Sequence, residues 1–187
     1  MNLSDYRNIK IAFFDIDGTM IDIGSRKITP KMLETLSGLQ KNGIRICIAT
    51  GRPPAILPQF PGIEFDAYLT FNASYCYTKN EVIFRNPIPA ADVQTVIRNA
   101  SKIQRPLALA GASRMGANGS DKDLADYFAI SRHKLEIIDD FDELAREEIF
   151  QIMIGCRENE YASILEDVKG ARITAWWDRA ADIISAT

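Results

Sequence analysis

The sequence predicts an α/β protein with a parallel sheet in its first part and a second module of the α+β class. Strand and helix patterns alternate along residues 1–84, and such alternation implies right-handed βαβ units. The strand patterns there are short, apolar and rich in β-branched residues. Residues 85–89, R-N-P-I-P, indicate a connection between two bodies. We therefore expect one domain in residues 1–84 and a second in residues 85–187.

The first domain is expected to contain three strands and one well-defined helix. A Thr29 cap and Pro30 predict the start of that helix, and Asn42 with Gly43 predicts its end. In chain order we expect a strand over 9–14, a β-like flap over 20–28, the helix over 30–42, a strand over 44–49, a weak helix after Pro54 and a short strand over 67–70.

The second domain mixes helices and strands and is expected to have its own core. Apolar residues on one side of the 90–103 segment predict an amphipathic helix. Further helices are expected over 120–128, 141–148 and 158–168, strands over 107–110, 149–154, 171–176 and 181–184, and a hairpin over 111–120.

Composition excludes several classes of protein. The chain has 187 residues, is 47% hydrophobic and carries a net charge of −3, so it lacks the basic footprint of a nucleic-acid-binding protein. No apolar run approaches the ~20 residues of a membrane-spanning helix, and the polar N-terminus does not resemble a signal peptide. We expect a cytoplasmic protein whose three cysteines, Cys47, Cys76 and Cys156, are reduced thiols. The single histidine, His133, is assigned no role.

Residues 11–20, I-A-F-F-D-I-D-G-T-M, are the most informative stretch for function. A short apolar strand leads Asp15 and Asp17 into a Gly-Thr turn. Two carboxylates at the end of a buried strand repel each other and lose hydration, so a fold that retains both pairs them with a cation or uses one as a nucleophile. An Asx-turn or a helix cap is the structural alternative, but it explains a single Asp better than this pair.

This decapeptide resembles the first signature of the haloacid dehalogenase-like (HAD) superfamily, whose members mostly hydrolyse phosphate esters through an aspartyl-phosphate. The resemblance implies a Rossmann-like core. It makes Asp15 the nucleophile, Asp17 the general acid/base, and Gly18 part of the phosphate-binding turn. It also implies Mg²⁺ held by the Asp15 carboxylate and the main-chain carbonyl of Asp17. A dication offsets the repulsion between a carboxylate and a phosphomonoester of about −1.5 to −2 charges.

Two further strand ends fit this resemblance. Residues 44–54, I-R-I-C-I-A-T-G-R-P-P, end a strand at Thr50 and Gly51, which match the second motif of the superfamily and would grip the phosphoryl group. A structural N-cap explains Thr50 as well. Asn72 occupies the place of an Asn-Gly turn in the similar Cof-type subgroup, although Ala73 replaces the glycine here. Asn72 either contacts substrate or holds the turn.

The resemblance makes the second domain a late-inserted cap that selects the leaving group. The implied substrate is a small phosphorylated metabolite such as a sugar phosphate. Arg114 and Asn118 lie on a glycine-bearing loop of this domain, where they either meet a polar substrate or belong to a solvated hairpin.

Complete HAD-like proteins also supply a third-motif lysine and a fourth-motif G-D-x-x-N-D cluster, yet these 187 residues contain no Gly-Asp pair. We therefore expect that the C-terminal part of the core is not present, that catalysis is impaired, and that the uncovered strand over 9–14 favours self-association. The alternative is an inactive, truncated HAD-like protein that binds phosphate or metal and self-associates. A phospho-accepting receiver domain is disfavoured because it has no second module.

Overall fold

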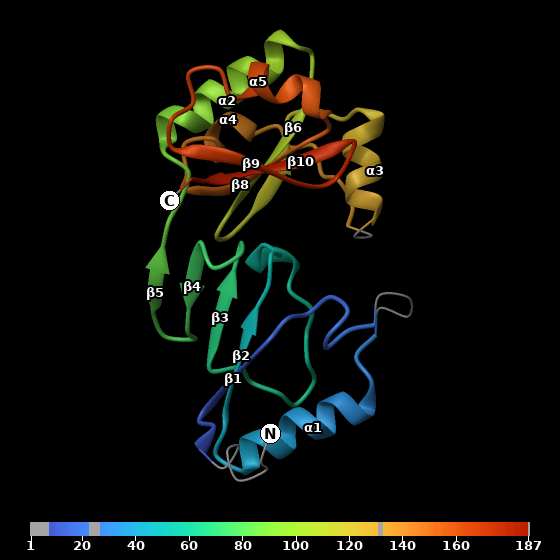
Figure 1. The fold of residues 1–187 in the computed structure, drawn as a ribbon, viewed down its shortest axis with the longest axis vertical. Helices are drawn as coiled ribbons and strands as arrows, with labels where there is room; N and C mark the ends of the chain where they lie inside the picture. The colour runs from blue at the N-terminus through green and yellow to red at the C-terminus, as the bar shows by residue number, and fades with distance from the viewer. Residues whose placement is uncertain (1–7, 23–26, 131–132, 187) are drawn as a thin grey trace. The chain divides into compact units, whose positions relative to one another are not determined.

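The computed structural model describes residues 8–22, 27–130 and 133–186 (Figure 1). By their contacts, the residues of the chain form two compact units. The first unit comprises Met1–Arg52 and Leu57–Arg85, and the second comprises Pro53–Ile56 and Asn86–Thr187. Each unit has a five-stranded sheet of its own.

The sheet of the first unit has the strand order β1-β2-β3-β4-β5. Its strands are β1 (Ile11–Phe14), β2 (Arg45–Ala49), β3 (Ala67–Thr70), β4 (Tyr75–Tyr77) and β5 (Val82–Arg85). The pairs β1·β2 and β2·β3 are parallel, whereas β4 and β5 extend the sheet as an antiparallel hairpin. The expected α/β class with a parallel sheet is confirmed.

Helix α1 (Pro30–Lys41) packs on one face of this sheet and encloses the core of the first unit. The Thr29 hydroxyl accepts a hydrogen bond from the Met32 amide at 3.2 Å, so the expected cap is formed. The buried residues of this core, which include Leu36 of the helix, are Ile16, Met20, Ile21, Leu36, Ile46, Ile48, Phe60 and Phe65. Ile16 belongs to this core, and it therefore anchors the loop that carries the two carboxylates.

Three expectations for the first unit need correction or restriction. The β4-β5 hairpin was not expected, because the β5 sequence V-I-F-R does not alternate apolar and polar residues; all four residues are exposed. The segment after Pro54 forms only a three-residue 3₁₀ turn, Pro54–Ile56, since Pro58 and Pro61 follow closely and cannot continue a helix. Of the expected flap, an antiparallel bridge joins Ile21 to Ile28, and residues 23–26 lie outside the described chain.

The second unit is an antiparallel sheet with the strand order β7-β6-β8-β10-β9. Its strands are β6 (Leu107–Gly111), β7 (Met115–Ala117), β8 (Ile149–Ile154), β9 (Ala171–Trp177) and β10 (Ala180–Ser185). Its helices are α2 (Ala90–Lys102), α3 (Lys122–Ile130), α4 (Phe141–Leu144) and α5 (Tyr161–Ile164), and a 3₁₀ turn, Glu158–Glu160, precedes α5.

Helices α2, α4 and α5 bury one face of the second sheet, and Figure 1 shows them together on that side. Strand residues of this core include Leu109, Ile152 and Ile183. On β10, Asp182 lies between the apolar residues Ala181 and Ile183 and is itself buried. The Tyr127 hydroxyl donates to it at 2.7 Å, and burial raises the pKa of the Asp182 carboxyl. Burial thus disfavours the charged form of this carboxyl group, while the hydrogen bond from Tyr127 stabilises it.

Two helices of the second unit are shorter than the sequence predicts. Segment 158–168 ends its α-helix at Ile164, where the Asn99 amide donates to the carbonyls of Ile164 and Glu166 at 3.1 and 2.8 Å. Segment 141–148 ends at Leu144, and the Gln94 amide donates to the carbonyl of Ala145 at 3.0 Å. In both cases a distant side chain of α2 satisfies the carbonyls that a longer helix would use.

Strand β1 lies at one edge of the first sheet in the part of the chain that the structure describes. Its side chains Ile11 and Phe13 share a face and are 44% and 52% exposed. No described helix is both long and apolar enough to span a bilayer.

Candidate active site

The carboxyl ends of three parallel strands meet at one edge of the first sheet. Asp15 follows β1, and Thr50 follows β2. These residues line a cavity of about 320 Å³ together with Ala49, Gly51, Leu69, Asn72 and Ala73. Ligands of parallel α/β sheets bind at such strand ends. The structure thus brings four of the predicted site residues, Asp15, Thr50, Gly51 and Asn72, around one cavity.

The loop after β1 is a tight, hydrogen-bonded turn. The buried Ile16 carbonyl accepts from the amides of Met20 and Ile21 at 3.1 and 2.9 Å. Gly18 has φ +81°, which glycine adopts without strain, and its amide donates to the Ile21 carbonyl at 2.8 Å. Asp15 and Asp17, on either side of Ile16, are exposed. The turn therefore holds both carboxylates on the surface, while Gly18 shapes the loop and does not line the cavity.

Asp17 is not among the residues that line the cavity. Its carboxylate is paired with the guanidinium of Arg52, which lies two residues after Thr50. The hydrogen bond to Asp17 is the main cause that raises the pKa of Arg52, and the charge of Asp15 contributes in the same direction. Sequence reasoning missed Arg52. The available signal was an arginine directly after Thr-Gly at a strand end, where an anion site was already expected.

Thr50 is buried and hydrogen-bonded through both its main-chain amide and its hydroxyl. Its amide donates to the Leu69 carbonyl at 2.8 Å, and its hydroxyl accepts from the Arg52 amide at 3.2 Å. Because only a short 3₁₀ turn follows, the hydroxyl closes a local turn and does not cap an α-helix. The expected strand-turn-helix geometry is wrong here, and a helix N-terminus does not contribute to the site.

Asn72 packs against Gly51 across the cavity wall. The main-chain amide of Asn72 donates to the Thr50 carbonyl at 3.1 Å. This hydrogen bond joins the turn after β3 to the turn after β2. A Cβ atom at position 51 would lie 3.1 Å from the Asn72 Oδ1 atom, so any side chain there would press on Asn72. The backbone of Asn72 holds the turn, and its side chain remains beside the cavity; both interpretations of this residue fit the structure.

Three consecutive non-glycine residues after β3 adopt left-handed backbone conformations. The φ angles are +50° at Phe71, +54° at Asn72 and +71° at Ala73. Alanine adopts this conformation only with strain, of about 1–2 kcal/mol.

We expect Ala73→Gly to raise the free energy of unfolding by about 0.5–1 kcal/mol, because relief of the strain exceeds the added flexibility of the unfolded chain. Urea denaturation followed by far-UV circular dichroism measures this change. Ala12→Gly, in β1, is the matched control and should lower the stability. An equal loss in both variants would contradict the assigned strain.

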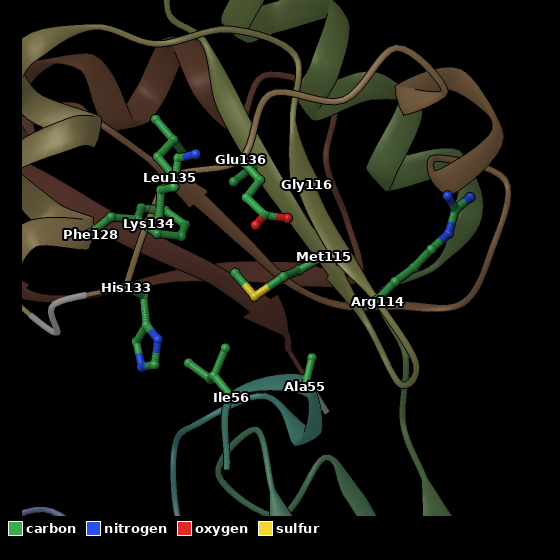
Figure 2. Close-up of a pocket in the computed structure, with 11 residues that line it drawn as sticks. Ala55, Ile56, Arg114, Met115, Gly116, Phe128, His133, Lys134, Leu135 and Glu136 are labelled. Atoms are coloured by element: carbon green, nitrogen blue, oxygen red, sulfur yellow. The ribbon is translucent and has the colours of Figure 1, made fainter. Parts of the chain in front are cut away.

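The second unit has a hollow of its own. Ala108 of β6, Met115 of β7 and Phe128 of α3 line it, together with residues 133–136 (Figure 2). Figure 2 shows the side chains of Met115 and Glu136 directed towards the same space.

The two candidate substrate residues of the second unit are held by other groups. Arg114 pairs with Asp140 and Glu147, and Asn118 accepts a hydrogen bond from the Leu107 amide at 3.0 Å. These contacts favour the hairpin role over substrate binding for Arg114 and Asn118.

Comparison with known proteins agrees with this architecture of a parallel core and a second α+β unit. Residues 12–187 match the family model of haloacid dehalogenase-like hydrolases. "Putative phosphatase YkrA" of Bacillus subtilis (strain 168) is 26% identical over 181 residues, which are 94% of this chain and 68% of that protein.

Two solved structures share the fold at 25% sequence identity. A hypothetical protein of Geobacillus kaustophilus HTA426 superposes with a TM-score of 0.81 over 96% of this chain and 70% of its own. The sugar phosphatase BT4131 of HAD subclass IIB superposes with a TM-score of 0.76 over 94% of this chain and 70% of its own.

The fold is that of an α/β core with a cap. The chain belongs to the haloacid dehalogenase-like hydrolases, and its matches are of the Cof type. The expected enzyme class, a HAD-like phosphatase, agrees with these findings.

Proposed function

We propose that the chain hydrolyses phosphate monoesters of small metabolites, with Asp15 as the nucleophile and Asp17 as the general acid/base. The single observation that carries the proposal is that Asp15 lines the same cavity as Thr50, Gly51 and Asn72. A nucleophilic carboxylate beside hydroxyl and amide donors is the arrangement that phosphoryl transfer requires, since catalysis depends on positioning and on charge stabilisation.

The proposed reaction has two steps. An oxygen of Asp15 attacks phosphorus and forms an acyl phosphate, while the bond from phosphorus to the leaving oxygen breaks and that oxygen takes a proton from Asp17. Water then attacks phosphorus, gives its proton to Asp17, and releases inorganic phosphate and the Asp15 carboxylate. The phosphoryl oxygens would be bound by donors around the cavity: the Thr50 hydroxyl, the Gly51 main-chain amide and the Asn72 side-chain amide.

The oxygen groups of the first loop fit Mg²⁺. We propose that the Asp15 carboxylate and the main-chain carbonyl of Asp17 hold it. Within the described residues, no three or more His, Cys, Asp or Glu side chains cluster as a complete metal cage. Mg²⁺ is nevertheless commonly bound by one or two carboxylates, with water and substrate phosphate completing its shell. When bound, the ion would offset the charge of the phosphate ester near Asp15.

We propose a sugar phosphate or a related small ester as the substrate class. A similar structure belongs to a sugar phosphatase, which supports this choice. The hollow of the second unit combines apolar and polar side chains, a composition suited to a small polar leaving group.

The alternative is a non-catalytic protein that binds phosphate or metal and self-associates. The exposed apolar face of β1 favours this second candidate. Turnover of p-nitrophenyl phosphate with Mg²⁺ separates the two: magnesium-dependent turnover supports the phosphatase, whereas a well-folded chain that binds phosphate without turnover supports the alternative.

We further propose that two copies of the chain associate through the uncovered β1 edge. Phe13→Lys is expected to shift the protein towards monomer, because a charge would replace the most exposed apolar side chain of β1. Light scattering after size exclusion at increasing concentration measures the shift. Ile83→Lys is the matched control, since Ile83 is 59% exposed on β5 at the opposite edge. A monodisperse wild-type monomer, or loss of association only in Ile83→Lys, would contradict the proposal.

A further inference from the structure

Asp17 and Arg52 form a bidentate ion pair. The Nε atom of Arg52 donates to Oδ2 of Asp17 at 2.8 Å, and Nη2 donates to Oδ1 at 2.6 Å. Both carboxylate oxygens therefore accept from one planar guanidinium. This geometry fits two oxygens of a phosphoryl group as well as it fits a carboxylate.

The two partners differ in how firmly they are held. The Arg52 side chain is 18% exposed, whereas that of Asp17 is 52% exposed. The Arg52 main chain is also fixed: its amide donates to the Thr50 hydroxyl at 3.2 Å, and its carbonyl accepts from the Phe71 amide at 3.3 Å. The guanidinium is thus the fixed partner, and the carboxylate is the one that can turn towards solvent.

Arg52 does not itself line the cavity, but its main chain and its charge link it to residues that do. Its amide bonds the Thr50 hydroxyl, and its charge interacts with Asp15 as well as Asp17. A dianionic phosphoryl group between Asp15 and Thr50 would need a cation close by, and among the described residues Arg52 is joined to both through hydrogen bonding or charge.

We infer that Arg52 is an anion receptor for the phosphoryl group and that the Asp17 carboxylate occupies it until the phosphoryl group arrives. Transfer of the guanidinium from carboxylate to phosphoryl oxygens then releases Asp17 to face the leaving group. Arg52 is in this sense a positioning residue for Asp17. Binding of the substrate frees the Asp17 carboxylate from its ion pair so that it can act as the acid/base. The inference rests on the proposed function, because it takes the cavity beside Asp15 as the phosphoryl site.

A double-mutant cycle on the affinity for inorganic phosphate tests this competition. Calorimetry in the presence of Mg²⁺ is applied to the full chain as wild type, Asp17→Asn, Arg52→Gln and the double variant. If the two groups compete, Asp17→Asn tightens phosphate binding by about tenfold when Arg52 is present. In the Arg52→Gln background the same substitution changes affinity by no more than about twofold.

The cycle removes the trivial effect of net charge. Loss of the Asp17 charge alone would strengthen phosphate binding equally in both backgrounds, and that result would overturn the inference. Arg52→Lys keeps the positive charge but cannot donate two parallel hydrogen bonds. In this background Asp17→Asn should therefore tighten phosphate binding by less than it does with Arg52. Arg45→Gln, at the opposite end of β2, is the matched control for loss of one positive charge and should leave the effect of Asp17→Asn unchanged.

Failure of the inference can be told apart from failure of the proposed function. Circular dichroism verifies that each variant is folded before binding is measured. If phosphate binds and Thr50→Val weakens it, but the cycle shows no coupling, only the role of Arg52 is wrong. If neither the wild type nor any folded variant binds phosphate, both the site and the inference are wrong.

Discussion

Asp15→Asn is expected to abolish the phosphatase activity of this chain, with a fall in kcat on the order of 10⁴-fold or more. The amide cannot form the acyl phosphate, while its size and its place beside the cavity are retained. Release of p-nitrophenol from p-nitrophenyl phosphate with Mg²⁺ measures the loss.

Glu34→Gln is the matched control, since Glu34 is an exposed carboxylate of α1. This variant should turn over substrate as the wild type does. Retained turnover in a folded Asp15→Asn protein would show that another group attacks phosphorus, and the assignment of the nucleophile would then be wrong.

Arg105→Gln is expected to destabilise the second unit strongly. Nε and Nη2 of Arg105 donate to the two oxygens of Glu160, each at 2.9 Å, and Nη1 contacts Asp121 and Asp123 at 3.1 and 3.4 Å. Arg105 is only 20% exposed, so its removal takes a cation away from the poorly hydrated carboxylates of Glu160 and Asp121, whereas Asp123 keeps its pair with Arg157. We expect a loss of about 2–3 kcal/mol, below the 3–5 kcal/mol of a fully buried pair.

Tryptophan fluorescence during urea denaturation measures this loss, because both tryptophans, Trp176 and Trp177, belong to the second unit. Lys122→Gln is the control. Lys122 is 79% exposed and pairs with Asp126 one helical turn away, so its removal should cost less than about 0.5 kcal/mol. Equal losses in the two variants would contradict a special role of Arg105.

The same cluster predicts how the stability of the second unit depends on pH. Arg105 lowers the pKa of Glu160, and Arg157 lowers the pKa of Asp123. Both carboxylates therefore contribute stability above their unfolded pKa values, about 4.3 and 3.9, and this stability is lost as the pH falls through the lower folded values. Arg105→Gln should make the free energy of unfolding fall less steeply as the pH is lowered. Denaturation curves between pH 3 and 7 would show this change.

Much of the fold could be predicted because local patterns and tertiary structure agree there. The parallel order of β1, β2 and β3 follows from alternating strand and helix patterns, and the chain at Thr29 carries its own cap. The errors arise where distant side chains decide. Asn99 ends α5 early, and nothing in segment 158–168 itself shows this.

The strand-end residues of the candidate site could be predicted from the sequence, whereas its ion pair could not. Strand ends alone place Asp15, Thr50 and Asn72 at one sheet edge, and their catalytic roles remain predictions that the experiments above test. Arg52 was not predictable as the partner of Asp17, since the two residues approach only after the loops behind β1 and β2 fold together. A pairing across 35 positions leaves no periodic trace in the sequence.

The three thiols of the chain differ in their surroundings. Cys47 and Cys156 are buried, and burial raises the pKa of Cys156 to about 12, so both resist alkylation in the folded state. Cys76 is only half-buried, and its Sγ atom donates to the Ala73 carbonyl at 3.3 Å. A maleimide dye would therefore attach first beside the left-handed turn, next to the proposed phosphoryl site, without any engineered cysteine.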